Sequence, residues 1–117
     1  MAQYSTVLDG VLDGVFVALA DPTRRAVLRR LGRGPASVGD LASEAPMTLP
    51  SFMKHVRVLE SNGLIRTAKS GRVRTCELNR ERFALVDDWL AEQRNSWADR
   101  TDRLERFVTT PQEKEKQ

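Results

Sequence analysis

The first 19 residues carry apolar side chains at intervals of three and four, which predicts an amphipathic helix with a wide apolar stripe. A second helix is predicted within "DPTRRAVLRRLGRG", because Asp21 is a suitable N-cap, Pro22 suits the first helical position and two glycines close the segment. A short third helix is predicted in "SVGDLASEA", with Ser37 as its N-cap.

The segment "TLPSFMKHVRVLE" predicts a fourth helix, capped by Thr48 and ended by a left-handed glycine at Gly63. Phe52, Val56 and Leu59 follow helical spacing, so we expect them to face the core. Two short helices joined by a few residues, the second basic at its start, are typical of a helix-turn-helix.

In "LIRTAKSGRVRTCEL" the period changes from helical to alternating, with "KSGR" as a turn, which predicts a two-stranded β-hairpin. After a cap at Asn79, a near-heptad apolar stripe predicts a long helix over 83–108, followed by a disordered tail over 109–117. The predicted fold class is mainly α with a small β part. It is a winged helix-turn-helix in one domain, 1–108, whose long terminal helices form a dimer interface.

Positive charge is concentrated in the middle of the chain. Residues 48–74 hold six basic residues against one acidic residue, a net charge of +5 in a chain whose total is only +3. This concentration favours a polyanionic partner. A single cysteine, the lack of a signal-peptide pattern and the shortness of the longest apolar run predict a cytoplasmic protein with no membrane partner.

Four segments, "ALADPTRRAVLRRL", "SVGDLA", "LPSFMKHVRVLESNGLI" and "GRVRTCEL", resemble the ArsR/SmtB-type repressor family in order and spacing, over about residues 15–80. The resemblance implies a homodimeric bacterial transcriptional repressor that leaves its operator when a signal is sensed. The family's metal sensors carry "CVCDL" in the third helix, whereas Ser37 and Gly39 stand at the two thiolate positions here. Soft metals need those sulfurs, so we expect a metal-independent member with no cofactor.

The predicted DNA-binding residues lie on the exposed side of the fourth helix and in the hairpin, because the major groove admits an α-helix and a basic wing can reach the neighbouring minor groove or backbone. They are Thr48, Ser51, Met53, Lys54, His55 and Arg57 in the helix, and Lys69, Arg72 and Arg74 in the hairpin. The alternative is that the hairpin cations are simply exposed to solvent at the hairpin tip and contact no DNA.

The first and last helices carry apolar stripes that the small core of one copy leaves uncovered, which predicts that they form a dimer interface. The expected interface residues are Val11, Phe16, Leu90, Trp97 and Leu104. Two copies would read two half-sites of a near-palindromic double-stranded operator, spaced by about one turn of DNA.

Two other functions compete with DNA binding. One is a winged-helix protein-interaction module without specific DNA binding, against which the basic hairpin argues. The other is an enzyme using His55 and Cys76, but the sequence offers neither an orienting third group nor an oxyanion donor motif, so no catalytic residue is predicted. Cys76 is more simply explained as a small apolar strand residue than as a redox sensor.

Overall fold

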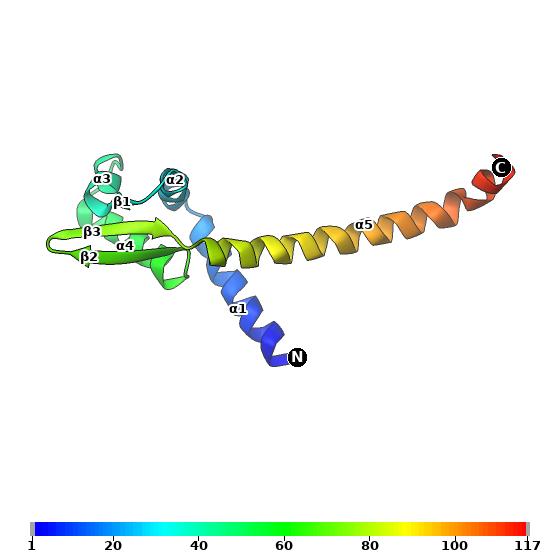
Figure 1. Ribbon diagram of the computed structural model, residues 1–117, viewed down its shortest axis with the longest axis horizontal. Helices are drawn as coiled ribbons and strands as arrows, with labels where there is room; N and C mark the ends of the chain where they lie inside the picture. The colour runs from blue at the N-terminus through cyan, green and yellow to red at the C-terminus, as the bar shows by residue number, and fades with distance from the viewer. Residues whose placement is uncertain (1, 117) are drawn as a thin grey trace. The chain divides into compact units, whose positions relative to one another are not determined.

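The computed structural model describes the backbone of residues 2–116 and the side chains of residues 6–108. Figure 1 shows the elements in chain order. They are α1 (Ala2–Leu19), α2 (Pro22–Leu31), β1 (Ala36–Ser37), α3 (Val38–Ser43), α4 (Leu49–Ser61), β2 (Ile65–Ser70), β3 (Val73–Leu78) and α5 (Arg80–Lys116). The chain forms two compact units, 1–83 and 84–117, and the first contains the whole helix-turn-helix and hairpin.

The starts of the three short helices are fixed by side chains that the sequence predicted as N-caps. Asp21 accepts a hydrogen bond from the backbone N–H of Arg24 at 3.0 Å, and Ser37 accepts one from Asp40 at 3.0 Å. Thr48 Oγ1 accepts from the backbone N–H of Ser51 at 3.3 Å. Each bond pairs one of the N–H groups that a helix start leaves without an intrahelical partner, so these predictions are confirmed.

The predicted hairpin is confirmed, and its two-residue turn places Ser70 opposite Val73. Gly71, the first central residue, has φ +61°, the pattern of a type II′ turn. The sequence missed a third strand, β1, which pairs antiparallel with β3 to give the order β1-β3-β2. A two-residue strand is too short to show alternation, and only the fold brings it beside β3.

The core of the first unit lies between α1, the short helices and the sheet. The buried residues of α2, α3 and α4 are Val27, Leu28, Leu31, Val38, Leu41, Phe52, Val56 and Leu59. Those of α4 are the three predicted from helical spacing, so that prediction is confirmed. Gly14 in α1 allows close helix packing, because a Cβ there would collide with the side chain of Asn62 at the end of α4. Gly63 has φ +75°, as predicted for the residue that ends α4.

The last helix, α5, begins three residues earlier than predicted and its backbone is helical as far as Lys116. Residues 109–117 were expected to be disordered, whereas the backbone of 109–116 is helical. The side chains of 109–117 lie outside the described residues. The predicted side-chain cap at Asn79 is wrong. Its Nδ2 donates to the carbonyl of Gly63 at 2.8 Å, and its Oδ1 has no partner among the described residues.

Candidate nucleic-acid interface

The exposed side of α4 carries two of the predicted DNA-contacting cations. Phe52, Val56 and Leu59 bury one side of this helix. Since consecutive residues are about 100° apart around an α-helix, Lys54 and Arg57 project from the opposite side, and both are exposed. The helix thus presents positive charge on the side that the core does not use.

One flank of α4 forms a groove of about 430 Å³ with the start of α3 and the hairpin. Its lining residues are Ser37, Val38, Gly39, Leu49, Met53, Lys69, Arg72, Val73 and Arg74. The structure therefore brings together four of the predicted DNA-binding residues. Met53 comes from α4, the recognition helix of the helix-turn-helix, and Lys69, Arg72 and Arg74 come from the hairpin, or wing. The residues from the start of α3 were not predicted, because only the pairing of strand β1 with strand β3 places them here.

Two wing cations lie directly opposite each other in the β-ladder. Lys69 pairs with Arg74, and both residues alternate in phase with the buried Cys76, so both belong to the face of the hairpin that is turned towards the helices. Like charges placed opposite one another in a sheet lower stability. An anion in the groove would offset this repulsion, which is a reason to expect an anionic ligand there.

A chain of hydrogen bonds attaches the wing to the recognition helix. Arg74 Nη1 donates to Thr67 Oγ1 at 2.9 Å, and the Thr67 hydroxyl in turn donates to the carboxylate of Glu60 on α4. The one acidic residue of the basic segment thus positions a wing arginine. This arrangement holds the wing and the helix in a fixed geometry on either side of the groove.

The start of α4 provides donors suited to a phosphate. The helix has no acidic residue in its first turn, and both Thr48 and Ser51 are exposed. The Thr48 hydroxyl caps the helix and donates to Ser51 Oγ at 3.1 Å. The positive end of the helix dipole and the two exposed hydroxyls favour an anion at this position, although Pro50 has no N–H and the N–H of Ser51 is bonded to Thr48.

His55 lies on the other flank of α4 and does not line the groove. Its Nδ1 is 3.0 Å from Arg24 Nη1 and 3.6 Å from Asp21 Oδ2, and its side chain is only 21% exposed. A guanidinium only donates, so Nδ1 is the acceptor wherever the contact with Arg24 is a hydrogen bond. Arg24 also donates to the carbonyls of Ala18 and Val17, at 2.8 and 3.1 Å.

This cluster joins the recognition helix to the end of α1. Partial burial acts to raise the pKa of Asp21, but the hydrogen bond from the backbone of Arg24 and the neighbouring positive charge outweigh it and lower that pKa. The ionised carboxylate therefore caps α2 and stays beside Arg24. The structure thus gives His55 a contact within the fold, and its predicted contact with DNA stays a prediction.

Two other sites were considered from the sequence, a redox-sensing Cys76 and a metal site, and the local geometry gives them little support. Cys76 is fully buried, and its burial, followed by the nearby carboxylate of Glu60, raises the pKa of the thiol. Such a thiol lacks the low pKa and the access of a redox sensor. Within the part of the chain that the structure describes, no group of three or more His, Cys, Asp or Glu residues could hold a metal ion.

The predicted interface helices expose large apolar side chains. In α1, Phe16 is 42% exposed and Val11 is half-buried. In α5, Leu90, Trp97 and Leu104 are seven residues apart and are 38%, 59% and 64% exposed.

No described helix is both long enough and apolar enough to cross a bilayer.

The fold and the groove define a winged helix-turn-helix protein, and comparison with known proteins gives the family. The helix-turn-helix domain family matches residues 19–68. The HTH-type transcriptional regulator Rv2034 of Mycobacterium tuberculosis is 39% identical over 67 residues, which cover 57% of this chain and 63% of that protein. The transcriptional repressor SdpR of Bacillus subtilis is 32% identical over 68 residues, which cover 58% of this chain and 76% of the repressor.

Two solved structures extend the similarity. The crystal structure of an ArsR family transcriptional regulator, RHA00566, is 59% identical with a TM-score of 0.74, over 77% of this chain and 93% of the other. The homodimeric winged helix-turn-helix DNA-binding domain of Mb0332 from Mycobacterium bovis is 25% identical with a TM-score of 0.63, over 80% of this chain and 89% of the other. The chain belongs to the ArsR family of winged helix-turn-helix transcriptional regulators.

Proposed function

We propose that the chain is a sequence-specific DNA-binding repressor that acts as a homodimer. The observation that carries the proposal is the groove in which Met53 of the recognition helix and three wing cations lie together, next to the exposed Lys54 and Arg57. The spans shared with Rv2034 and SdpR, which are named as a transcriptional regulator and a transcriptional repressor, support it.

Each residue has a role that follows from its chemistry. Ser51 and Lys54 can hydrogen-bond base edges in the major groove, while Met53 offers an apolar contact to a thymine methyl group. Arg57 neutralises the DNA backbone, and Thr48 at the positive end of the α4 dipole receives a phosphate. The wing residues Lys69, Arg72 and Arg74 reach the adjacent minor groove or backbone. His55 contacts Arg24, which bonds two carbonyls at the end of α1, and so supports α4 from the flank opposite the groove.

Dimerisation through α1 and α5 would bury the apolar side chains that a single copy exposes. Val11 and Phe16 would contribute from α1, and the heptad-spaced Leu90, Trp97 and Leu104 from α5. A protein with two-fold symmetry reads two half-sites, so the operator is expected to be near-palindromic. The Mb0332 domain, which is described as homodimeric, supports this arrangement.

The proposal makes the chain a cytoplasmic DNA-binding protein rather than an enzyme, and one whose signal is not a thiolate-bound metal. At the family's thiolate positions, the hydroxyl of Ser37 is engaged as the N-cap of α3 and Gly39 has no side chain. A single hydroxyl in use as a helix cap is a poor substitute for two thiolates.

Fluorescence anisotropy tests the proposal with labelled DNA from upstream of the protein's own gene and a scrambled duplex of equal composition. We expect selective binding to the upstream DNA that weakens steeply as salt is raised, because phosphate contacts release counterions. Equal and weak binding to both duplexes would refute specific recognition. Salt-insensitive association with a protein would instead support the interaction-module alternative.

A further inference from the structure

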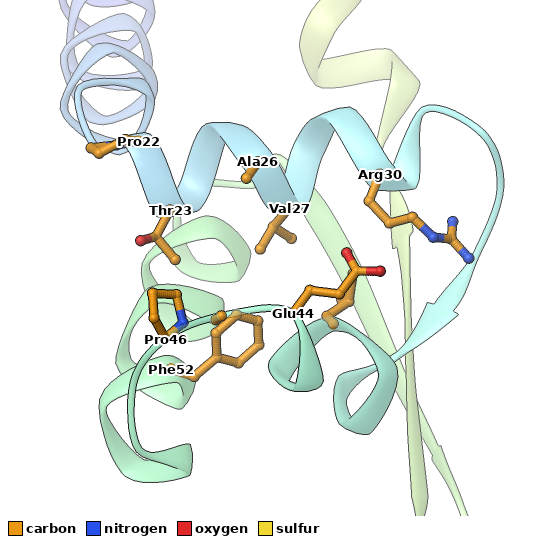
Figure 2. Close-up of a pocket in the computed structure, with 10 residues that line it drawn as sticks. Pro22, Thr23, Ala26, Val27, Arg30, Glu44, Pro46 and Phe52 are labelled. Atoms are coloured by element: carbon orange, nitrogen blue, oxygen red, sulfur yellow. The ribbon is translucent and has the colours of Figure 1, made fainter.

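A second cavity, of about 230 Å³, lies inside the helix-turn-helix between α2, the end of α3 and the start of α4. Figure 2 shows its lining residues. Its walls are mostly apolar, with Ala26 and Val27 from α2, Pro46 from the turn before α4 and Phe52 from α4 itself. The DNA-contacting groove shares none of these residues, so the cavity is a separate feature of the molecule.

One carboxylate at the cavity, exposed to solvent, has no protein partner among the described residues. Glu44, the residue that ends α3, is exposed at the cavity, and its carboxylate forms no hydrogen bond or ion pair among the described residues. The lining also contains a cation, Arg30, whose Nη1 donates to the carbonyl of Gly34 at 3.1 Å. The cavity therefore has an apolar interior and, at its edge, a solvent-exposed carboxylate that is available to a ligand.

We propose that this cavity binds a small amphipathic amine, whose ammonium group pairs with Glu44 while a single ring or short chain enters the apolar interior. Its volume of about 230 Å³ is below the roughly 300–1,000 Å³ of drug-sized sites, so the ligand is small. The ammonium donates a hydrogen bond to the carboxylate and is attracted to it as an ion pair, whereas a neutral donor lacks the ion-pair attraction and a carboxylate analogue has nothing to donate.

Ligand binding at this position bears on the recognition helix. Phe52 is 1% exposed and follows Ser51 and precedes Met53, two residues of the proposed DNA surface. Pressure on its ring therefore shifts the start of α4 relative to α2. We expect the amine to weaken DNA binding, an effect that rests on the proposed function, whereas the cavity itself can be tested on the free protein.

Titration of the ¹⁵N-labelled full-length chain with phenethylammonium chloride, at constant ionic strength, tests the site. The expected result is a saturable shift of the backbone amides of Thr23, Ala45 and Phe52. The matched anion 3-phenylpropionate, which keeps the ring and reverses the charge, should bind at least about fivefold more weakly. Absence of a saturable shift, or equal affinity for the two probes, overturns the proposal.

Three variants separate the site from nonspecific charge effects. Glu44→Gln keeps the shape of an exposed side chain and should weaken phenethylammonium binding about fivefold. Ala26→Leu, at an exposed helical position, should fill the cavity and abolish binding. Glu77→Gln, an exposed wing carboxylate outside the cavity, should leave the affinity unchanged. Equal effects of the two glutamate substitutions would refute the role of Glu44.

The coupling is measured by repeating the DNA titration with saturating phenethylammonium. The apparent dissociation constant for DNA should rise in the wild-type protein and stay constant in Ala26→Leu. Thermodynamic linkage requires the same factor in the weakening of amine binding by DNA. Unchanged DNA affinity alongside saturable amide shifts would refute the coupling. Absence of any DNA binding alongside those shifts would refute the proposed function and leave the amine site standing.

Discussion

Arg72 offers the most direct test of the wing as a DNA contact. It occupies the second central position of the hairpin turn, is exposed, and forms no hydrogen bond or ion pair with any residue that the structure describes. Replacing it by alanine removes one charge without removing an intramolecular contact. The stability of the fold should therefore stay within about 0.5 kcal/mol of the wild type.

The effect on DNA binding follows from counterion release. Each phosphate neutralised on double-stranded DNA contributes about 0.9 to the slope of log affinity against log salt concentration. One lost contact in each protomer lowers the slope of a dimer by about 1.8. Near 0.15 M salt, this corresponds to about a fivefold loss for each protomer and about a thirtyfold loss for the dimer.

The assay is fluorescence anisotropy with the upstream duplex, at several salt concentrations between about 50 and 200 mM. Arg72→Lys should preserve the slope because the charge remains. Arg33→Ala is the matched control, since Arg33 is an exposed arginine outside the groove and should give a wild-type slope. An unchanged slope in Arg72→Ala, with thermal unfolding like that of the wild type, would show that the wing tip does not neutralise a phosphate.

Three further predictions concern the fold. The pKa of Asp21 is lowered in the folded state, so its charge stabilises the protein above the ordinary pKa of 3.8. This stabilisation is lost as the pH falls through the pKa of Asp21 in the folded protein, and the difference in urea midpoint between wild type and Asp21→Asn should therefore shrink in acid. Gly63→Ala should lower the unfolding free energy by about 1 kcal/mol or more, because φ is +75° and a Cβ would lie 2.7 Å from the Arg82 guanidinium; an unchanged urea midpoint would contradict this. Cys76 should react with a thiol reagent only at the rate of unfolding, and rapid labelling of the native protein would contradict its burial.

Local patterns in the sequence were enough for the helices, their caps and the hairpin. Asp21, Ser37 and Thr48 act on groups within three residues, so their capping could be predicted without knowledge of the rest of the chain. Helical spacing likewise identified the buried side of α4. Asn79 is the exception, because its amide donates to Gly63, a residue 16 positions away in the sequence.

The composition of the candidate interface needed the tertiary structure. The sequence identified a basic helix and a basic hairpin, but the participation of the α3 start in the groove depends on the short strand β1 reaching β3. Lys54 and His55 are adjacent in sequence but about 100° apart around α4. His55 therefore points towards Arg24, whereas Lys54 is exposed.

The sequence by itself determined the class of protein, because helix periodicity, caps and turn residues act over a few positions and the charge is concentrated in one segment. Tertiary structure decided which side chains share the groove, which one braces α4 against α1, and where a cavity with a free carboxylate lies. These features depend on contacts between residues distant in the chain, whose distances no local pattern specifies.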